Sequence, residues 1–107
     1  MKKGINIWSF GRELSAREYI ELAKDAGYDG IEFGLAETGV VSLESSDDDI
    51  KEIKRIAEGE GIETPSLASG LYWDYPITSS NEETRKKSRS IVRRQLEIAA
   101  ILGADTI

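Results

Sequence analysis

Glu32 is the residue whose surroundings point most directly to chemistry. It lies between Ile31 and Phe33, near the end of a predicted strand over residues 30–35. Burying a lone carboxylate among apolar neighbours costs free energy, so the presence of Glu32 at this position favours a functional role. At a strand end it could accept a hydrogen bond from a hydroxyl of a bound ligand. The alternative is a solvated carboxylate or one paired with an arginine. We expect Glu32 to contact a ligand.

Asn6 and Trp8 are the next candidates. Both lie in a predicted strand over residues 4–10, and because side chains alternate along a strand they would share one face. Trp8 could form an apolar wall for a ring-shaped ligand, with its indole N–H as a donor, or it could fill the core. For Asn6 the pattern slightly favours a structural hydrogen bond. We include both residues in the predicted ligand site.

An aromatic segment follows the third predicted strand. Residues 70–80 contain Tyr72, Trp73 and Tyr75. A loop rarely exposes so much ring surface without a partner. We expect this loop to overhang a ligand site as a lid that excludes water, with Ser69 at its base. Packing against a neighbouring loop or a second copy of the chain is the alternative. Ser69, Tyr72 and Trp73 therefore join the predicted site.

Repeated helix signals mark the elements that must position these residues. Three stretches begin with a serine followed three residues later by an acid, which is the pattern of a helix N-terminal cap: Ser15, Ser46 and Ser80. Each continues as an apolar stripe with helical spacing and ends near a glycine, which easily adopts the left-handed conformation after a helix: Gly27, Gly61 and Gly103. We predict helices over residues 15–26, 47–60 and 81–102.

Short β-type runs alternate with these helices. They cover residues 4–10, 30–35 and 62–69, and a fourth begins at residues 105–107. Strict alternation of strands and helices is typical of parallel βαβ units. We predict an α/β fold in which residues 1–107 form the N-terminal part of a single (β/α)8 TIM-barrel domain. It would contain three strand–helix units and the start of a fourth strand. Since a whole barrel takes about 250 residues, we expect the chain to be truncated within that strand.

Composition narrows the possible partners. The 107 residues carry 14 Lys and Arg against 20 Asp and Glu, a net charge of −6, which argues against a nucleic-acid partner. No stretch of roughly 20 apolar residues could cross a membrane, and the lack of cysteine fits a cytoplasmic protein. We interpret the acidic residues 47–49 as charge compensation at a helix start, and the six basic residues within 81–102 as a solvated helix face.

Three stretches of the chain resemble a known family. Residues 1–6, 27–33 and 66–79 are similar to the sugar-phosphate isomerase/epimerase-like proteins of the xylose-isomerase-like TIM-barrel superfamily. The last stretch resembles the hexulose-phosphate isomerase and pentulose-phosphate 3-epimerase branch. The chain departs from that branch at Leu71 and Tyr72, where a histidine often stands beside the Ser-Gly pair, and this departure leaves the substrate open.

The resemblance implies a divalent-metal enzyme. In this family two glutamates, an aspartate and a histidine or glutamine on the fifth to eighth strands hold the metal, which we expect to be Mn, Mg, Co or Zn. Paired glutamates then move a proton at the carbon next to a carbonyl. Those strands lie outside residues 1–107, so we assign no catalytic residue and no metal ligand to this chain. We expect the chain to be inactive by itself.

The function that the resemblance implies is that of a sugar or sugar-phosphate isomerase or epimerase. Its substrate would be a small sugar, bound opposite the metal by six residues: Asn6, Trp8, Glu32, Ser69, Tyr72 and Trp73. An open sheet leaves a face and edges to cover, so we also expect a homo-oligomer. One alternative is a metal-dependent dehydratase of a cyclic polyol or keto acid. The others are an apurinic-site endonuclease, which the negative charge disfavours, and a non-catalytic, self-associating α/β module.

Overall fold

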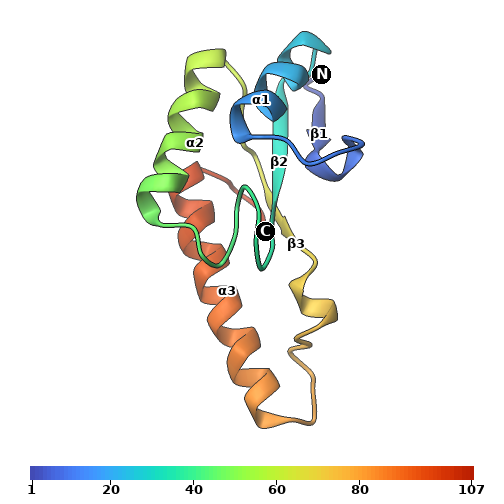
Figure 1. Cartoon of the computed structure of the whole chain (residues 1–107), viewed down its shortest axis with the longest axis vertical. Helices are drawn as coiled ribbons and strands as arrows, with labels where there is room; N and C mark the ends of the chain where they lie inside the picture. The colour runs from blue at the N-terminus through green and yellow to red at the C-terminus, as the bar shows by residue number, and fades with distance from the viewer.

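The computed structural model describes all 107 residues and contains a three-stranded parallel sheet (Figure 1). Its strands are β1 (Gly4–Asn6), β2 (Gly30–Leu35) and β3 (Leu67–Ser69), in the order β1-β2-β3. An α-helix follows each strand along the chain, so the predicted alternation of parallel strands and helices is confirmed. In Figure 1 the strands run downward, and the loops that follow their carboxyl ends lie on the lower side.

Three α-helices pack on this sheet: α1 (Ala16–Asp25), α2 (Asp47–Glu60) and α3 (Glu82–Leu102). Each lies within one residue of its predicted bounds, and α2 packs against both α1 and α3. Two short 3-10 helices, η1 (Ile7–Ser9) and η2 (Leu71–Trp73), follow β1 and β3. None of the helices combines the length and the apolar content that crossing a bilayer requires.

The core lies between the sheet and the helices and is built on the alternation of β2. Ile31, Phe33 and Leu35 are at most 1% exposed, and they join one cluster with apolar residues of all three helices. Burial of such a side chain stabilises a fold by about 1.5–3 kcal/mol. Because successive side chains of a strand point to opposite faces, Glu32 and Gly34 face the side of the sheet that is turned away from the helices.

Two of the three predicted helix caps are confirmed. The Ser15 Oγ accepts a hydrogen bond from the Glu18 N–H at 3.2 Å, at the start of α1. At the start of α2, the Ser46 Oγ accepts from the Asp49 N–H at 3.1 Å, and the Ser46 N–H donates to the Asp49 carboxylate at 2.8 Å. The hydrogen bond that the Ser46 N–H donates to the carboxylate is the main reason why the pKa of Asp49 lies below its usual range.

The third predicted cap is wrong by one residue. Asn81, not Ser80, caps α3, and its Oδ1 accepts from the Thr84 N–H at 3.1 Å. Asparagine is as good an N-cap as serine, so two adjacent residues competed and the sequence pattern alone did not separate them. The three predicted glycines do adopt the left-handed conformation after each helix, with φ between 71° and 82°.

The first strand is shorter than the predicted range 4–10. The Asn6 Oδ1 accepts a hydrogen bond from the Trp8 N–H at 2.7 Å, and this bond turns the chain into η1 directly after β1. An asparagine that binds its own backbone two residues on is a local competitor of strand structure. The strand prediction for residues 7–10 is therefore wrong.

The third strand is also shorter than the predicted range 62–69, and the structure assigns only Leu67–Ser69 to β3. In the first half of the predicted range only Glu63 bridges β2, and Pro65 has no N–H to donate to a ladder. Of the predicted fourth strand, the structure forms one isolated parallel bridge, between Ser66 and Thr106. There the Leu67 N–H donates to the Thr106 carbonyl at 3.1 Å.

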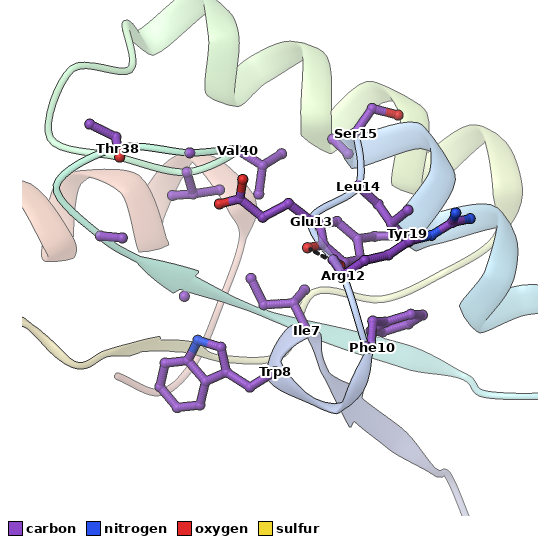
Figure 2. Close-up of a pocket in the computed structure, with 16 residues that line it drawn as sticks. Ile7, Trp8, Phe10, Arg12, Glu13, Leu14, Ser15, Tyr19, Thr38 and Val40 are labelled. Carbon is purple, nitrogen blue, oxygen red and sulfur yellow. Dashed lines mark hydrogen bonds between the residues drawn. The ribbon is translucent and has the colours of Figure 1, made fainter.

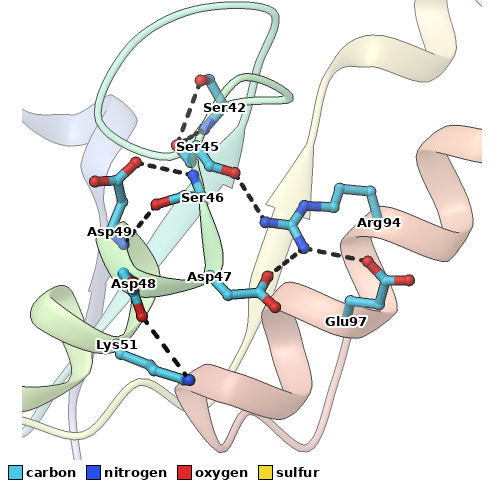
Figure 3. Close-up of polar contacts among 9 residues, drawn as sticks. All are labelled: Ser42, Ser45, Ser46, Asp47, Asp48, Asp49, Lys51, Arg94 and Glu97. Atoms are coloured by element: carbon cyan, nitrogen blue, oxygen red, sulfur yellow. Dashed lines mark hydrogen bonds and ion pairs between the residues drawn. The ribbon is translucent and has the colours of Figure 1, made fainter.

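A network of ion pairs joins the start of α2 to α3 (Figure 3). The Arg94 Nη1 donates to the carboxylates of Asp47 at 2.7 Å and Glu97 at 3.1 Å, and its Nη2 donates to the Ser45 carbonyl at 2.8 Å. The Arg94 side chain is only 20% exposed, and its hydrogen bond to Asp47 raises the pKa of the guanidinium. The basic face of α3, predicted as solvated, therefore includes one residue that holds two elements together.

We expect Arg94→Ala to lower the free energy of unfolding by about 1.5–3 kcal/mol, because it removes charge-assisted hydrogen bonds from a largely buried guanidinium. Arg55→Ala is the matched control, since Arg55 pairs with Glu52 on an exposed helix surface and should contribute less than about 1 kcal/mol. Urea unfolding followed by circular dichroism measures both. Equal losses in the two variants would contradict the role given to Arg94.

Ser88 of α3 is fully buried, and its Oγ has no hydrogen-bond partner. An unsatisfied buried hydroxyl costs about 1–3 kcal/mol, and alanine is the better helix former. Ser88→Ala should therefore raise the free energy of unfolding by roughly 1 kcal/mol. The exposed Ser90, whose Oγ donates to the Lys87 carbonyl at 2.7 Å, offers a control on the same helix. A less stable Ser88→Ala protein would show that the hydroxyl has a partner after all.

Candidate functional site

A row of polar side chains crosses the face of the sheet that is turned away from the helices. Asn6 lies opposite Glu32 in the register of β1 and β2, and Ser66 lies beside Glu32 just before β3. The Asn6 Nδ2 donates to Glu32 Oε1 at 2.6 Å, and the Ser66 Oγ donates to Glu32 Oε2 at 2.5 Å. The Glu32 carboxylate is therefore partly buried and is bound by neutral donors rather than by an arginine.

Trp8 lies on η1, beyond the end of β1, so it does not share a strand face with Asn6 as predicted. Its ring rests on β2: a Cβ added at Gly34 would stand 3.2 Å from Cζ2 and Nε1 of Trp8. Trp8 is nevertheless 63% exposed, so it lines the surface and does not fill the core. An aromatic ring that is supported on one side and open on the other can pack against the apolar part of a ligand.

A cavity of about 690 Å³ opens beside Trp8, between the segments that follow β1 and β2 (Figure 2). Its volume lies within the usual range of small-molecule sites. The walls are largely apolar and include Phe10 and Tyr19. In Figure 2 the Glu13 carboxylate points toward the segment that carries Val40.

The sequence analysis missed most of the walls of this cavity, which come from residues 10–16 and 38–41. A signal was available, because both segments directly follow the carboxyl ends of the first two strands, where barrels of this kind place functional groups. The loop after β3 carries an aromatic cluster that marks it in the sequence, whereas the segments after β1 and β2 carry no such cluster. In addition, the predicted strand 4–10 extended too far and absorbed the start of the first segment.

The aromatic loop after β3 is tied to α3 through Tyr72. The Tyr72 hydroxyl donates to Gln95 Oε1 at 2.6 Å, and the Gln95 Nε2 donates to the Leu67 carbonyl at 2.8 Å. Gln95 is only 3% exposed, so both ends of its buried amide are satisfied. Burial raises the pKa of the Tyr72 hydroxyl. The Tyr72 ring therefore packs against the rest of the protein. The sequence analysis gave packing of this loop as the alternative to an overhanging lid.

The other residues of the loop either stabilise its conformation or are exposed to solvent. The Ser69 Oγ donates to the Leu35 carbonyl at 2.9 Å and accepts from the Leu71 N–H at 3.2 Å, which fixes the turn at the end of β3. Tyr75 lies beneath the Lys87 ammonium, 5.6 Å from the ring centroid. Trp73 is 90% exposed.

The structure therefore divides the six predicted site residues into two groups and one separate residue. Asn6, Glu32 and Trp8 form one connected group, where the end of β1 lies beside the middle of β2. Ser69 and Tyr72 form a second group on the β3 side, and Trp73 projects by itself. No three side chains of the types that ligate metals gather at any point of the chain, so the residues described here do not fit a divalent-metal site.

The sequence matches the family model of the xylose isomerase-like TIM barrel over residues 20–107, and the chain therefore belongs to this family. It is 27% identical over 106 residues to a protein of Escherichia coli (strain K12) that carries the provisional name L-ribulose-5-phosphate 3-epimerase SgbU. That match covers 97% of this chain and 37% of the relative. The family resemblance predicted from the sequence is confirmed.

Two solved structures share the fold. One is a D-psicose 3-epimerase from Clostridium cellulolyticum H10, solved with D-tagatose, with a TM-score of 0.81. The other is a D-psicose 3-epimerase in the presence of D-fructose, with a TM-score of 0.78. Each is 24% identical to this chain and covers 97% of it, while the chain spans 35% of each neighbour. The predicted α/β fold, part of a TIM barrel, is thereby confirmed.

Gly34→Ala should displace the Trp8 ring, because a methyl group 3.2 Å from the indole leaves too little room. The indole Nε1–H signal of Trp8, assigned by its loss in Trp8→Phe, should shift in a proton–nitrogen NMR spectrum. Gly11→Ala, at a position where an added Cβ meets no atom within 4 Å, should leave that signal in place. An unchanged Trp8 signal in Gly34→Ala would contradict the seating of the ring on β2.

Proposed function

We propose that residues 1–107 form the sugar-binding side of an isomerase or epimerase that acts on a small sugar or sugar phosphate. The observation that carries this proposal is the exposed Trp8 ring, which lies after the end of β1 and against Gly34 near the end of β2, next to the polar row at Glu32. Enzymes of the TIM-barrel fold hold their substrates at the carboxyl ends of the strands. The relatives, which are named as 3-epimerases of L-ribulose 5-phosphate and of D-psicose, support the same class.

A sugar presents an apolar C–H face and several hydroxyl groups, so its site needs an apolar wall next to hydrogen-bond acceptors. The open side of the Trp8 ring would pack against the C–H face. Each Glu32 oxygen accepts one hydrogen bond from the protein and keeps lone-pair capacity for another. Asn6 and Glu32 would in this way complete the polar part of the site.

Ser69, Tyr72 and Trp73 would complete the wall from the β3 side. The hydroxyls of Ser69 and Tyr72 are engaged with the protein, so these two residues would shape the wall and support the loop. Trp73, which is 90% exposed, is the free aromatic ring of the loop. In the proposed site it closes over the sugar and excludes water.

In the proposed reaction a proton moves at the carbon next to a carbonyl. The chain spans 35–37% of the length of its relatives, and its own residues do not fit a metal site. We therefore assign the divalent ion that the family implies, Mn, Mg, Co or Zn, and the proton-transfer groups to parts of the full-length protein outside these residues. Residues 1–107 would bind and orient the sugar and be inactive alone.

The same proposal describes the protein as a whole. Residues 1–107 would be the first part of a single barrel domain in a cytoplasmic protein that forms homo-oligomers.

We expect the full-length protein, incubated in heavy water with divalent metal and either D-fructose or L-ribulose 5-phosphate, to introduce one deuterium at carbon 3 of the epimerised sugar. The reason is that the proton removed next to the carbonyl is returned from solvent to the opposite face. Proton NMR of the product locates the deuterium. Exchange at carbon 1 would indicate an isomerase of the same class, whereas loss of water would contradict the proposal and favour a dehydratase.

Trp8→Ala should raise KM for the sugar about tenfold with little change in kcat, because ring packing is lost equally in the ground state and the transition state. Leu96→Ala is the control, since Leu96 is an exposed apolar residue on α3, away from the proposed site. Steady-state kinetics on the full-length protein measure both constants. A Trp8→Ala enzyme with unchanged KM would remove Trp8 from the sugar site.

A further inference from the structure

The Glu32 carboxylate is linked to Trp8 by two consecutive hydrogen bonds through the Asn6 side chain. The Asn6 Nδ2 donates to Glu32 Oε1 at 2.6 Å, and the Asn6 Oδ1 accepts from the Trp8 N–H at 2.7 Å. We propose that Glu32 is a positioning residue that fixes Trp8 through Asn6. That Trp8 contacts a sugar rests on the proposed function, whereas this relay does not.

The chemistry of the three groups dictates one orientation of Asn6. An asparagine amide has a donor end and an acceptor end, which exchange when the group rotates by half a turn. A carboxylate can only accept, so Glu32 binds the NH2 end. A backbone N–H can only donate, so Trp8 requires the oxygen end. Both neighbours therefore select the same orientation, and Glu32 holds the Asn6 oxygen in place for Trp8.

Glu32 is itself held from the other side of β2. Its second oxygen, Oε2, accepts from the Ser66 Oγ at 2.5 Å. With one partner on each oxygen, the plane of the carboxylate is fixed, and so is the direction in which it accepts from Asn6. The relay thus spans the three strand segments that carry Asn6, Glu32 and Ser66, and it places Trp8 relative to all of them.

The Asn6 oxygen determines where Trp8 lies because it caps η1. The bond to the Trp8 N–H ends β1 and begins the tight turn that carries the ring back over β2. Gly34, two residues after Glu32, leaves the room that the ring occupies. Trp8 is 63% exposed, so burial alone does not hold its ring, and the position of the Trp8 backbone decides where the ring stands.

The test is the hydrogen exchange of the Trp8 backbone N–H in protein labelled with nitrogen-15 tryptophan, with the signal assigned by its loss in Trp8→Phe. Asn6→Ala removes the acceptor and should accelerate exchange about tenfold. Glu32→Ala should accelerate it roughly three- to tenfold. Glu32→Gln keeps an oxygen for the Asn6 NH2 group and can donate to Ser66, so its rate should stay within about twofold of the parent.

Coupling between the two sites separates a relay from general loosening. In the Asn6→Ala background, Glu32→Ala should cause no further acceleration, because the path to Trp8 is already broken. Glu52→Ala, which removes an exposed carboxylate from α2, is the control and should leave the Trp8 rate unchanged. Additive effects of the two substitutions would overturn the proposal, and so would a Glu32→Gln protein that exchanges as fast as Glu32→Ala.

If Glu32→Ala does not fold, Asn6→Asp takes its place. That substitution keeps an acceptor for the Trp8 N–H but replaces the donor to Glu32 with a second carboxylate. Exchange at Trp8 should again accelerate roughly three- to tenfold, because the two carboxylates repel and the acceptor is no longer aligned. Exchange at the parent rate would overturn the proposal without any measurement of enzyme activity.

Discussion

The two-residue period of β2 is the constraint on which the rest of the structure depends. β2 pairs with β1 through Gly30–Glu32 and with β3 through Phe33–Leu35, so its two neighbours are staggered along it. A stagger of this kind accompanies the tilt of strands around a barrel. With the register fixed on both edges, β2 cannot slip by one residue without turning Phe33 out of the core and Glu32 into it.

That constraint explains why a carboxylate is tolerated at the centre of the sheet. Ile31 and Phe33, on either side of Glu32, are fully buried on the helix side. Glu32 is partly buried on the opposite side, where Asn6 and Ser66 satisfy its oxygens. Removal of either donor would leave a charged oxygen without one of its partners, which costs more than an ordinary hydrogen bond contributes. The polar row is therefore a coupled unit, and its members are best studied in pairs.

The helices were predictable because their signals are local. Ser15, Ser46 and the glycines that follow the helices act within a few residues of the bounds that they set. The strands were less predictable, since pairing is decided by distant segments and by side chains that compete for the backbone. Asn6 illustrates this: the same residue that suggested a strand face ends the strand by binding the Trp8 N–H.

The residues of the candidate site also differ in how far the sequence predicts them. The alternation of residues 31–33 was enough to single out Glu32, but its partner Ser66 lies 34 residues further along the chain and nothing local indicates it. The bond from Tyr72 to Gln95 was equally hidden, because Gln95 is a polar residue on the buried face of a helix. A sequence pattern can find a polar residue between buried apolar neighbours, whereas its hydrogen-bond partners become known only from the fold.

Arg94 fastens α3 near its middle, and the turns before it carry the aromatic loop past the end of the sheet (Figure 1). Arg85 and Lys87 bind that loop to the helix through the Ser79 carbonyl and the Tyr75 ring. The part of α3 before Arg94 is about 18 Å long, so a tilt of about 3° at Arg94 would move its tip by about 1 Å. Because the aromatic loop is bound to this part of α3, a change in the contacts of Arg94 that tilted the helix would move the rim around Trp73 without any change in the strands.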